Sequence, residues 1–272
     1  MEDIAARLGK IAMIGGGKMG EAIVAGLVNG ALFDPNSIVV ADPGADRRAY
    51  LSHTYAISCV EDGRQISKPT TVILAVKPQV LREVIATLAT NSDCKPERVI
   101  SIAAGITTAT IRSVFPDAAV IRVMPNAPLM VGAGMSCISV AEGTPRSEGE
   151  LVRELFSLMG EALLIDEGLL NVTTALSGSG PAYFALFVEK LSEAGVAAGL
   201  TESESLLLAQ QTLIGTGRYL ALTGQTPSEL RAAVTSPNGT TQAALECMET
   251  GGFTALVNDL VQAALRRAEE LA

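Results

Sequence analysis

A short apolar run that leads directly into a glycine cluster is the feature that most limits how this chain can fold. "IAMIGGGKMGEAIVAGL" reads as a buried strand, then Gly15 to Gly20, then an amphipathic helix. The glycine pattern alone is a weak signal, but its place between a strand and a helix near the start of a βαβ series makes it a strong one. The sequence therefore predicts a dinucleotide site whose phosphates sit on the free amides of the helix start.

Each glycine of this cluster has an expected task. Gly15 would allow the tight turn, Gly17 the close approach of the pyrophosphate, and Gly20 the close packing of helix on strand. Lys18 and Met19 lie in the same turn and are expected beside the cofactor.

The periodicity of the chain changes near residue 166. Before it, β-branched runs alternate with amphipathic segments such as 18–30 and 78–90, and strands are expected at 10–15, 37–42, 70–76, 98–105, 119–125 and 135–141. After it, helices are expected at about 167–196, 201–222, 226–233, 239–249 and 251–270. The predicted fold is an α/β Rossmann-type N-terminal domain with a largely parallel sheet (1–165), followed by an all-α C-terminal dimerisation domain (166–272).

Residues 168–188 carry no charge, and this length raises the question of a membrane span. The stretch contains "SGSGP" and several Ser, Thr and Asn residues. Burial against a second subunit explains an all-round apolar helix better, so a homodimer through the helical domain is expected.

Composition excludes several kinds of function. The net charge is −9 and no run of Lys or Arg forms a nucleic-acid or membrane footprint, so neither partner is expected. The four cysteines are scattered, and no metal site is expected. The start of the chain does not read as a secretion signal, which favours a cytoplasmic location. The single histidine, His53, is expected to be solvated near a helix end, which leaves no histidine for catalysis.

The choice between NADH and NADPH stays open at the sequence level. Asp42 closes the second expected strand, where an acid usually accepts the ribose hydroxyls and favours NAD. Arg47 and Arg48 follow within one turn and could instead hold the 2'-phosphate of NADP. Either dinucleotide is therefore expected, with NADPH slightly preferred.

Further cofactor contacts are expected where other strands end, because ligands of open α/β sheets bind in the crevice at the carboxyl edge. Lys77 could touch phosphate or adenine, although a solvent-facing lysine is an equal alternative, and Asn126 could bond the nicotinamide amide. The residues expected at this edge are Ala75, Val76, Lys77, Pro78, Ala103, Ala104, Gly105 and Asn126.

The helical half has few cations to bind an acid: Lys190, Arg218, Arg231, Arg266 and Arg267 against twelve Asp and Glu. A helix start offers another way to hold a carboxylate, through free amides, a positive dipole end and hydroxyl groups. "SPNGTT" has that composition, with an ordinary capped helix as the alternative reading.

These motifs together resemble the pyrroline-5-carboxylate reductase family. The resemblance rests, in order, on "IGGGKMG", "AVKPQ", "SIAAGIT", "RVMPNAP", "ALSGSGPAYFALFVEKLSEAGVAAGL" and "VTSPNGTTQAAL", and it covers nearly the whole chain. It implies hydride transfer from NADPH or NADH to the C=N carbon of 1-pyrroline-5-carboxylate, giving L-proline in the last step of proline biosynthesis. It also implies a homodimer that can assemble into larger rings, such as a decamer.

The family pattern assigns roles to individual residues. Ser236, Gly239, Thr240 and Thr241 would bind the substrate, and the Thr241 hydroxyl, as the catalytic group, would face the ring nitrogen. Glu167 is implied as a cofactor contact, with a solvated linker acid as the plainer alternative. The small residues of "SGSGP" would allow the long helix to pass close to the nicotinamide, or they would allow a tight helix crossing within the dimer.

Two positions depart from the family pattern. Asp62-Gly63 stands where an asparagine often touches the adenosine half, and Ala233 stands where some relatives have an asparagine near the substrate. Neither change removes a group that the chemistry needs.

Two rival functions are compatible with parts of the sequence. A β-hydroxy-acid dehydrogenase of the same plan would need Lys190 as its catalytic lysine, but Glu189 beside it favours a surface ion pair. A non-catalytic dinucleotide sensor would have no need for the "TSPNGTT" stretch.

Overall fold

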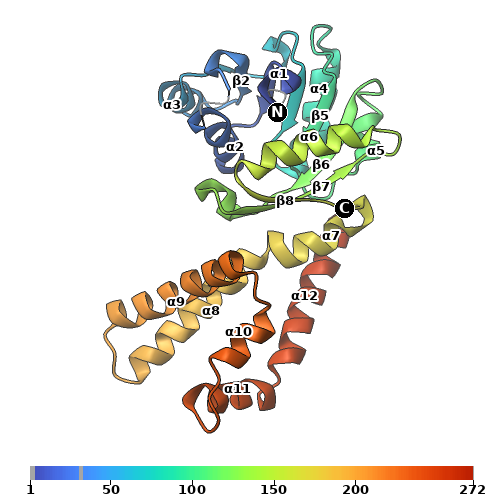
Figure 1. Cartoon of the computed structure of the whole chain (residues 1–272). Helices are drawn as coiled ribbons and strands as arrows, with labels where there is room; N and C mark the ends of the chain where they lie inside the picture. Colours follow the sequence, from blue (N-terminus) through green and yellow to red (C-terminus); the bar gives the residue numbers. More distant parts are fainter. Residues whose placement is uncertain (1–3, 31–32, 272) are drawn as a thin grey trace. The chain divides into compact units, whose positions relative to one another are not determined.

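The computed structural model describes residues 4–30 and 33–271 (Figure 1). Contacts divide the described chain into two units. The first runs to Ser179 and also includes the residues from Ala264 onward, and the second runs from Gly180 to Ala263. The expected boundary at 165/166 thus falls inside the first unit, and it remains a prediction about function.

The first unit is built on one eight-stranded sheet in the order β3-β2-β1-β4-β5-β6-β7-β8. Every pairing is parallel except the antiparallel one between β6 and β7. The strands are β1 (Ile11–Ile14), β2 (Ile38–Ala41), β3 (Ser58–Val60), β4 (Thr71–Leu74), β5 (Arg98–Ser101), β6 (Ala119–Met124), β7 (Gly134–Val140) and β8 (Gly160–Leu164). This order contains the dinucleotide-binding arrangement that the sequence predicts.

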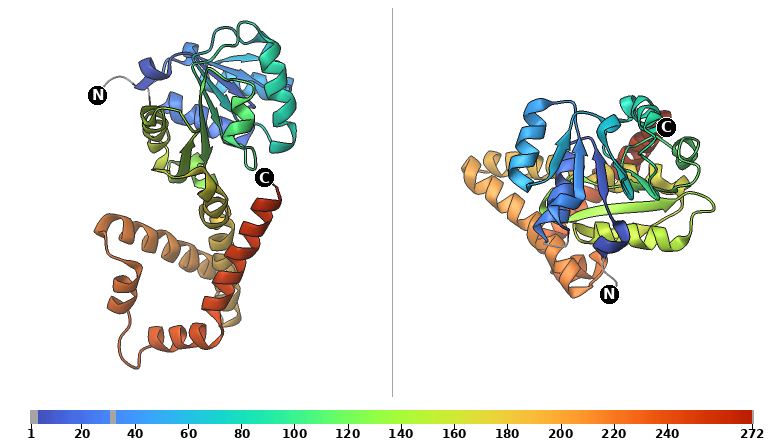
Figure 2. Two further views of the ribbon diagram at one scale, coloured as in Figure 1. Left: turned by 90° about the vertical axis from the view of Figure 1, so that its right-hand side faces the viewer. Right: turned by 90° about the horizontal axis from the view of Figure 1, so that it is seen from above.

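Helices cover both faces of the sheet (Figure 2). Successive residues of a strand point to opposite faces, so Ile11 and Met13 join one apolar core while Ala12 and Ile14 join the other. The helices α2 (Lys18–Asn29), α3 (Ala45–Tyr55) and α6 (Arg146–Ser157) complete the first core, and α4 (Pro78–Thr90) and α5 (Thr108–Arg112) complete the second. Burial on both faces explains why these strands are continuously apolar in sequence.

Six of the strands lie where the sequence places them, with shorter ends, and two were missed. The edge strand β3 has only three residues, of which Ser58 is exposed, so it has little apolar pattern to find. The other edge strand, β8, reads "GEALL" and lacks β-branched residues, so its composition favours a helix. Its pairing with β7 decides its conformation.

The expected helix at 167–196 is interrupted in the structure. It consists of the 3-10 turn η4 (Glu167–Leu169), the helix α7 (Leu170–Thr173), the π-helical turn η5 (Thr174–Gly178) and the helix α8 (Gly180–Ala197). The Ser179 amide donates to the Thr174 carbonyl oxygen at 2.8 Å, which is the wider spacing of a π turn. The interruption falls on the "SGSGP" motif.

The remaining helices of the chain are as the sequence predicts: α9 (Glu202–Thr223), α10 (Pro227–Ala233), α11 (Thr240–Thr250) and α12 (Phe253–Glu270). Local capping explains two of the starts. Thr201 and Glu204 form a reciprocal capping box at α9, and Thr226 and Glu229 form another at α10.

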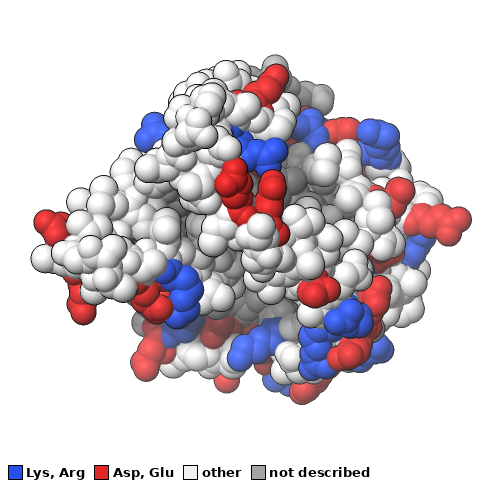
Figure 3. All heavy atoms as spheres, turned by 90° about the horizontal axis from the view of Figure 1, so that it is seen from below, with Lys and Arg blue, Asp and Glu red and all other residues white. Residues whose placement is uncertain are grey.

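The helices α8 and α9 pack on each other yet expose many large apolar side chains. On the face drawn in Figure 3, Lys and Arg lie among Asp and Glu, and broad areas carry neither kind of charge. Within the described ranges, no helix combines the length and the apolar character that a bilayer crossing requires. The exposed apolar residues of the two helices are Phe184, Leu186, Phe187, Leu191, Val196, Leu206, Leu207, Leu208, Leu213, Ile214, Tyr219 and Leu222.

A buried arginine ties the start of the chain to the sheet. The Arg98 side chain is 6% exposed and donates to Glu148 Oε2 at 2.8 Å and to the Arg7 carbonyl oxygen at 3.0 Å. It also donates to the Thr71 hydroxyl at 3.1 Å. Glu148, in the first turn of α6, therefore neutralises a cation that water cannot reach well.

We expect Glu148→Ala to destabilise the protein by roughly 1–3 kcal/mol, because it leaves the buried Arg98 guanidinium without its carboxylate. The matched control is Glu154→Ala, also in α6, whose carboxylate makes an exposed ion pair with Arg7 at 3.3 Å. Urea unfolding of both variants measures the difference. Equal midpoints for the two variants would contradict this role of Arg98.

Candidate active site

The switch in strand order between β1 and β4 creates the crevice where such sheets bind ligands. At this point the chain leaves β1 through Gly15, whose amide donates to the Ala41 carbonyl oxygen at 2.8 Å. The Ala75 amide, just after β4, donates to the Ile14 carbonyl oxygen at 2.8 Å. The ends of β1, β2 and β4 are therefore bound together directly below the glycine turn.

The glycine turn has no room for side chains at Gly15 and Gly20, where backbone atoms lie close. Gly15 has φ +101°, and a Cβ there would lie 2.7 Å from the Ala75 carbonyl oxygen. A Cβ on Gly20 would lie 2.3 Å from the Gly15 carbonyl oxygen, so only glycine lets α2 approach the end of β1 this closely. This geometry agrees with the tasks expected from the sequence.

The start of α2 is open to an anion. Gly17 is the N-cap, it is exposed, and nothing lies within 4 Å of where its Cβ would be. No side chain caps the first amides, which leaves their hydrogens and the positive end of the helix dipole for a ligand. A dinucleotide pyrophosphate fits these donors. Lys18 is exposed beside them, whereas Met19 packs partly against the core.

The loop after β4 begins α4 on the opposite side of the crevice. Lys77 is the exposed N-cap of α4, and Pro78 takes the first helical position. Ala75 and Val76 are half-buried against the glycine turn. After β5, Ala103 is buried and Gly105 adopts φ +72°. The structure thus brings these expected residues to the carboxyl edge of one sheet.

Asp42, at the end of β2, is held by two backbone amides. Its Oδ2 accepts the Gly16 amide at 2.8 Å, and its Oδ1 accepts the Gly44 amide at 2.9 Å. The carboxylate therefore lies against the glycine turn, where an acid can accept ribose hydroxyls.

The two arginines after Asp42 are both bonded within the protein. Arg47 Nε donates to the Gly16 carbonyl oxygen, and its Nη2 donates to Glu21 Oε2 at 2.5 Å. Arg48 Nη1 donates to the carbonyl oxygens of Asp42 and Pro43 at 2.8 and 2.9 Å. The partner of Arg47 was not anticipated, although an acid in the first turn of the fingerprint helix would have suggested it.

Glu21, on α2, accepts several hydrogen bonds. Its Oε1 accepts hydrogen bonds from the Tyr50 and Tyr55 hydroxyls at 2.9 and 3.0 Å, in addition to the bond from Arg47. Burial alone would raise the pKa of Glu21, but these hydrogen bonds lower it overall. Burial and the bond to Glu21 raise the pKa of Tyr55 to about 12. Glu21 is thus a fixed negative charge at neutral pH.

Asn126 follows β6 and is 9% exposed. Its Oδ1 accepts the Met135 amide at 2.8 Å, and its Nδ2 donates to the Ser177 carbonyl oxygen at 3.1 Å. The side chain therefore joins β7 to the π turn, and one Nδ2 hydrogen remains for a ligand. Its contact with nicotinamide stays a prediction.

Glu167 is part of a partly buried network. Its Oε1 accepts the Thr108 amide and Arg122 Nη1, both at 2.8 Å, and its Oε2 accepts the Thr108 hydroxyl at 2.6 Å. Burial alone would raise the pKa of Glu167, but the Thr108 and Arg122 bonds lower it overall. The carboxylate is committed to these partners, and a cofactor contact stays a prediction.

The π turn on "SGSGP" packs on the end of β6. A Cβ on Gly178 would lie 2.8 Å from the Met124 Cε, so a larger residue would require the Met124 side chain to move. The small residues of "SGSGP" indicated a close contact in the sequence. The sequence did not indicate that Met124 would be the partner.

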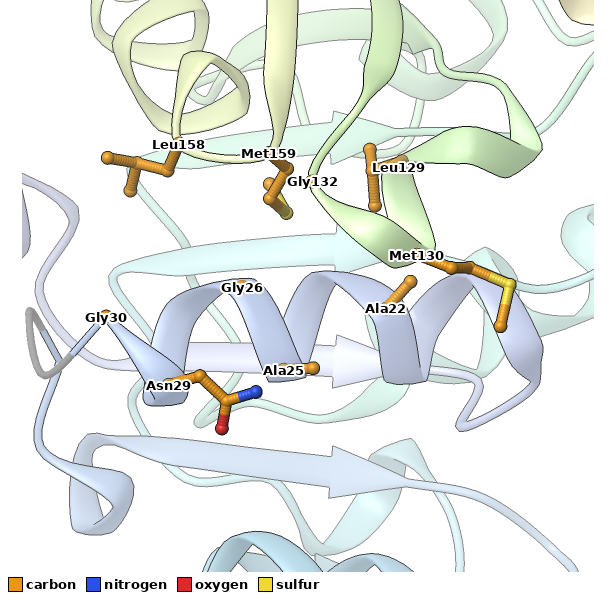
Figure 4. A pocket seen from close by; sticks show the side chains of 10 residues that line it. All are labelled: Ala22, Ala25, Gly26, Asn29, Gly30, Leu129, Met130, Gly132, Leu158 and Met159. Atoms are coloured by element: carbon orange, nitrogen blue, oxygen red, sulfur yellow. The ribbon is translucent and has the colours of Figure 1, made fainter. Parts of the chain in front are cut away.

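A pocket on the side of α2 lies apart from the glycine turn (Figure 4). Figure 4 shows Met159 pointing toward α2 at Gly26, with Leu158 and Leu129 above the same helix. Asn29 is the one lining residue with a hydrogen-bonding side chain, so the pocket has no group for acid–base chemistry. Its ten lining residues are Ala22, Ala25, Gly26, Asn29, Gly30, Leu129, Met130, Gly132, Leu158 and Met159.

In the second unit, the turn before α11 presents hydroxyl groups. Gly239 is the N-cap of α11, without a side-chain cap. Asn238 adopts φ +59°, and its amide donates to Gln242 Oε1 at 2.8 Å. No hydrogen bond between described residues uses the hydroxyls of Ser236, Thr240 or Thr241, which are the groups singled out in sequence.

Gln242 was not identified from the sequence. It supports the turn by accepting from Asn238, and its Nε2 donates to Glu246 Oε1 at 2.8 Å. The spacing of four residues from each partner is the pattern that could have revealed it.

Lys190 and His53 lie on the surface, as expected. Lys190 is 58% exposed and its Nζ bonds Glu193 Oε1 at 2.7 Å and Glu189 Oε1 at 3.3 Å. Hydrogen bonds to Glu193 and Glu189 raise the pKa of Lys190, which keeps it protonated. A β-hydroxy-acid dehydrogenase would need Lys190 as its catalytic lysine, and these surface ion pairs argue against that role. His53 is exposed in the last turn of α3.

The sheet order, the glycine turn at its switch point and the helical second unit define a dinucleotide-dependent oxidoreductase. The sequence is 40% identical over 263 residues to the pyrroline-5-carboxylate reductase of Synechocystis sp., covering 96% of this chain and 98% of that protein. The chain belongs to the pyrroline-5-carboxylate reductase family.

Further comparisons agree. The family model "Pyrroline-5-carboxylate reductase dimerisation" matches residues 167–271, and "NADP oxidoreductase coenzyme F420-dependent" matches residues 10–105. The structure of a pyrroline-5-carboxylate reductase from Coxiella burnetii superposes with a TM-score of 0.90 at 34% identity, covering 97% of this chain and 99% of that one. The Plasmodium falciparum enzyme, solved with NADP bound, gives 0.83 at 25% identity, with 97% and 98% covered.

The expected fold class and family are therefore confirmed, and so is the expected activity, an NAD(P)H-dependent reductase of proline biosynthesis that acts on a C=N bond. The dimerisation match also supports a homo-oligomer.

We expect Glu167→Gln to destabilise the protein by roughly 1–3 kcal/mol at pH 7, since Arg122 would lose its carboxylate. Because the folded-state pKa of Glu167 is lowered from its ordinary 4.5, this contribution is fully present above about pH 4.5 and is lost as the pH falls further. Urea unfolding at pH 7 and in acid, with the exposed Glu161→Gln as control, measures it. A difference that grows in acid would refute the assignment.

Proposed function

We propose that the turn at residues 236–241 binds the carboxylate of 1-pyrroline-5-carboxylate, so that the chain reduces its C=N bond to give L-proline. A reduced nicotinamide dinucleotide, NADPH or NADH, supplies the hydride. The observation that carries the proposal is a helix start whose first amides have no side-chain cap, beside three hydroxyls without a hydrogen-bond partner among the described residues.

The chemistry of this turn suits a small anion. The first amides of α11 lack intrahelical acceptors, and the positive end of the helix dipole favours negative charge. A Cβ on Gly239 would lie 2.3 Å from Ser236 Oγ, so glycine leaves the space in which the Ser236 hydroxyl lies. Ser236 and Thr240 then supply hydroxyl donors, and Thr240 and Thr241 supply amide donors, to the two carboxylate oxygens. Gly239, whose own amide donates to the Ser236 carbonyl oxygen at 3.0 Å, keeps the turn tight beside the substrate.

Thr241 has a second proposed task at the ring nitrogen. Its hydroxyl can bond that nitrogen and hold a proton at Oγ1, either directly or through water. The imine accepts a hydride readily once its nitrogen is hydrogen-bonded or protonated, and orientation supplies most of the acceleration. No histidine is needed for such chemistry.

We further propose which residues hold the cofactor. Gly15, Gly17, Lys18, Met19 and Gly20 would bind the pyrophosphate, and Asp42 and Arg47 would flank the ribose. The remaining contacts would come from Ala75, Val76, Lys77, Pro78, Ala103, Ala104, Gly105, Asn126 and Glu167. The functional division of the chain would then be 1–165 for the cofactor and 166–272 for substrate and dimerisation.

A cytoplasmic location is part of the proposal, because reduced nicotinamide dinucleotides are supplied there and the cysteines are free thiols.

The test mixes the full chain with 1-pyrroline-5-carboxylate and either NADH or NADPH. The loss of absorbance of the reduced nicotinamide measures oxidation of the dinucleotide. We expect Thr241→Ala to lower kcat/KM by about 5- to 150-fold, the equivalent of roughly 1–3 kcal/mol for a lost buried hydroxyl contact. Thr250→Ala, at the other end of α11, is the matched control because its hydroxyl bonds only helix carbonyl oxygens.

The two arms of this experiment separate the claims. No oxidation of either dinucleotide would defeat the reductase function itself. Turnover with Thr241→Ala equal to that of the control would remove Thr241 from the mechanism.

We also expect the chain to assemble through α8 and α9, as a dimer and then a decamer, because their exposed apolar side chains need cover. Light scattering after size-exclusion chromatography measures the mass. Leu207→Glu, at a 66% exposed position of α9, should lower that mass, and Glu202→Gln in the first turn of the same helix should not. A monomeric parent chain would refute this expectation.

A further inference from the structure

The acid at the end of β2 is fixed in the orientation that suits an unmodified ribose. Both oxygens of Asp42 are anchored, Oδ2 on the Gly16 amide at 2.8 Å and Oδ1 on the Gly44 amide at 2.9 Å. A carboxylate oxygen has two acceptor positions, so each oxygen can still accept one ribose hydroxyl. Because one amide belongs to the glycine turn and the other to the loop after β2, the carboxylate cannot turn away without losing both bonds.

A 2'-phosphate would meet this carboxylate differently. The phosphate of NADP carries close to two negative charges at neutral pH and has no hydrogen to donate to Asp42. At hydrogen-bonding distance the two anions repel each other, and the repulsion is stronger in a partly buried site than in water. The same group that stabilises NADH therefore opposes NADPH.

Arg47 already has partners within the protein. Arg47 is bonded to the Gly16 carbonyl oxygen and to Glu21 Oε2, and its guanidinium carbon lies 5.1 Å from the centre of the Tyr50 ring. Its side chain is 29% exposed and that of Glu21 is 18% exposed, so the pair is partly shielded from water. Arg47 is thus neutralised by its own neighbour.

Arg48 is also partly engaged by the protein. One end of its guanidinium is bonded to the carbonyl oxygens of Asp42 and Pro43. Together Glu21, Asp42, Arg47 and Arg48 have a formal charge of zero, which gives no net attraction for an additional dianionic group.

We propose that Asp42 determines the cofactor specificity of this chain in favour of NADH over NADPH, and that Glu21 reinforces the choice by holding Arg47. The sequence alone leaves a slight preference for NADPH, because it shows two arginines near the acid but not what they bind. The inference concerns cofactor binding only, so it stands or falls independently of the turn at 236–241.

The test is equilibrium binding to the full-length chain without substrate. Titration calorimetry gives Kd for each dinucleotide, and nicotinamide fluorescence gives a second measurement. We expect the ratio of Kd for NADPH to Kd for NADH to be about tenfold or more. Equal affinities, or tighter binding of NADPH, would overturn the proposal.

Three variants locate the cause. Asp42→Asn keeps an acceptor for one amide but removes the charge, so it should lower the ratio of Kd for NADPH to Kd for NADH about tenfold. Asp42→Ser should lower this ratio equally, and it replaces Asp42→Asn in the test if that variant fails to fold. Glu21→Gln should release Arg47 and lower the ratio about threefold through tighter NADPH binding. Glu83→Gln, an equal change of charge at an exposed position of α4, is the control.

An unchanged ratio in folded Asp42 variants would overturn the role of Asp42. A Glu21→Gln ratio equal to that of Glu83→Gln would overturn the role of Glu21.

Discussion

The close approach of α2 to the end of β1 is the contact on which the cofactor half of this protein depends. Gly20 lies so near the Gly15 carbonyl oxygen that any Cβ would collide with it, and Gly15 in turn fits against Ala75. This packing brings the uncapped amides of α2 to the point where the strand order switches. The remaining features of the crevice are arranged around that point, because they lie at the carboxyl ends of the same strands.

The polar groups of the two proposed binding regions differ in whether they already have partners. Near the glycine turn two charged side chains are already bonded: Asp42 to two amides and Arg47 to Glu21. Such groups keep the crevice in shape before a ligand arrives, which lowers the cost of ordering it on binding. In the turn before α11 the hydroxyls have no partners among the described residues, so they are free to bond a ligand.

Much of this could be predicted from the order of residues. The glycine turn, six strands and the helices from α9 onward follow from local patterns of apolar residues, glycines and caps. The motif at 236–241 was found through its composition and its family resemblance. The strands β3 and β8 were not predicted, because a three-residue edge and the helix-favouring "GEALL" take their conformation from neighbouring strands. The break at "SGSGP" was likewise missed, since the apolar pattern of 167–196 continues through the π turn at Thr174–Gly178.

The sequence by itself therefore determined the class of fold, the position of the dinucleotide turn and the identity of the hydroxyl-rich turn. These depend on interactions between residues close in the chain, where spacing and backbone preference suffice. Only the tertiary structure decided what the charged side chains bind: Arg47 meets Glu21, Arg98 meets Glu148, and Glu167 meets Arg122. Those partners lie 26, 50 and 45 positions apart, and a charge has no periodicity that could reveal a distant partner.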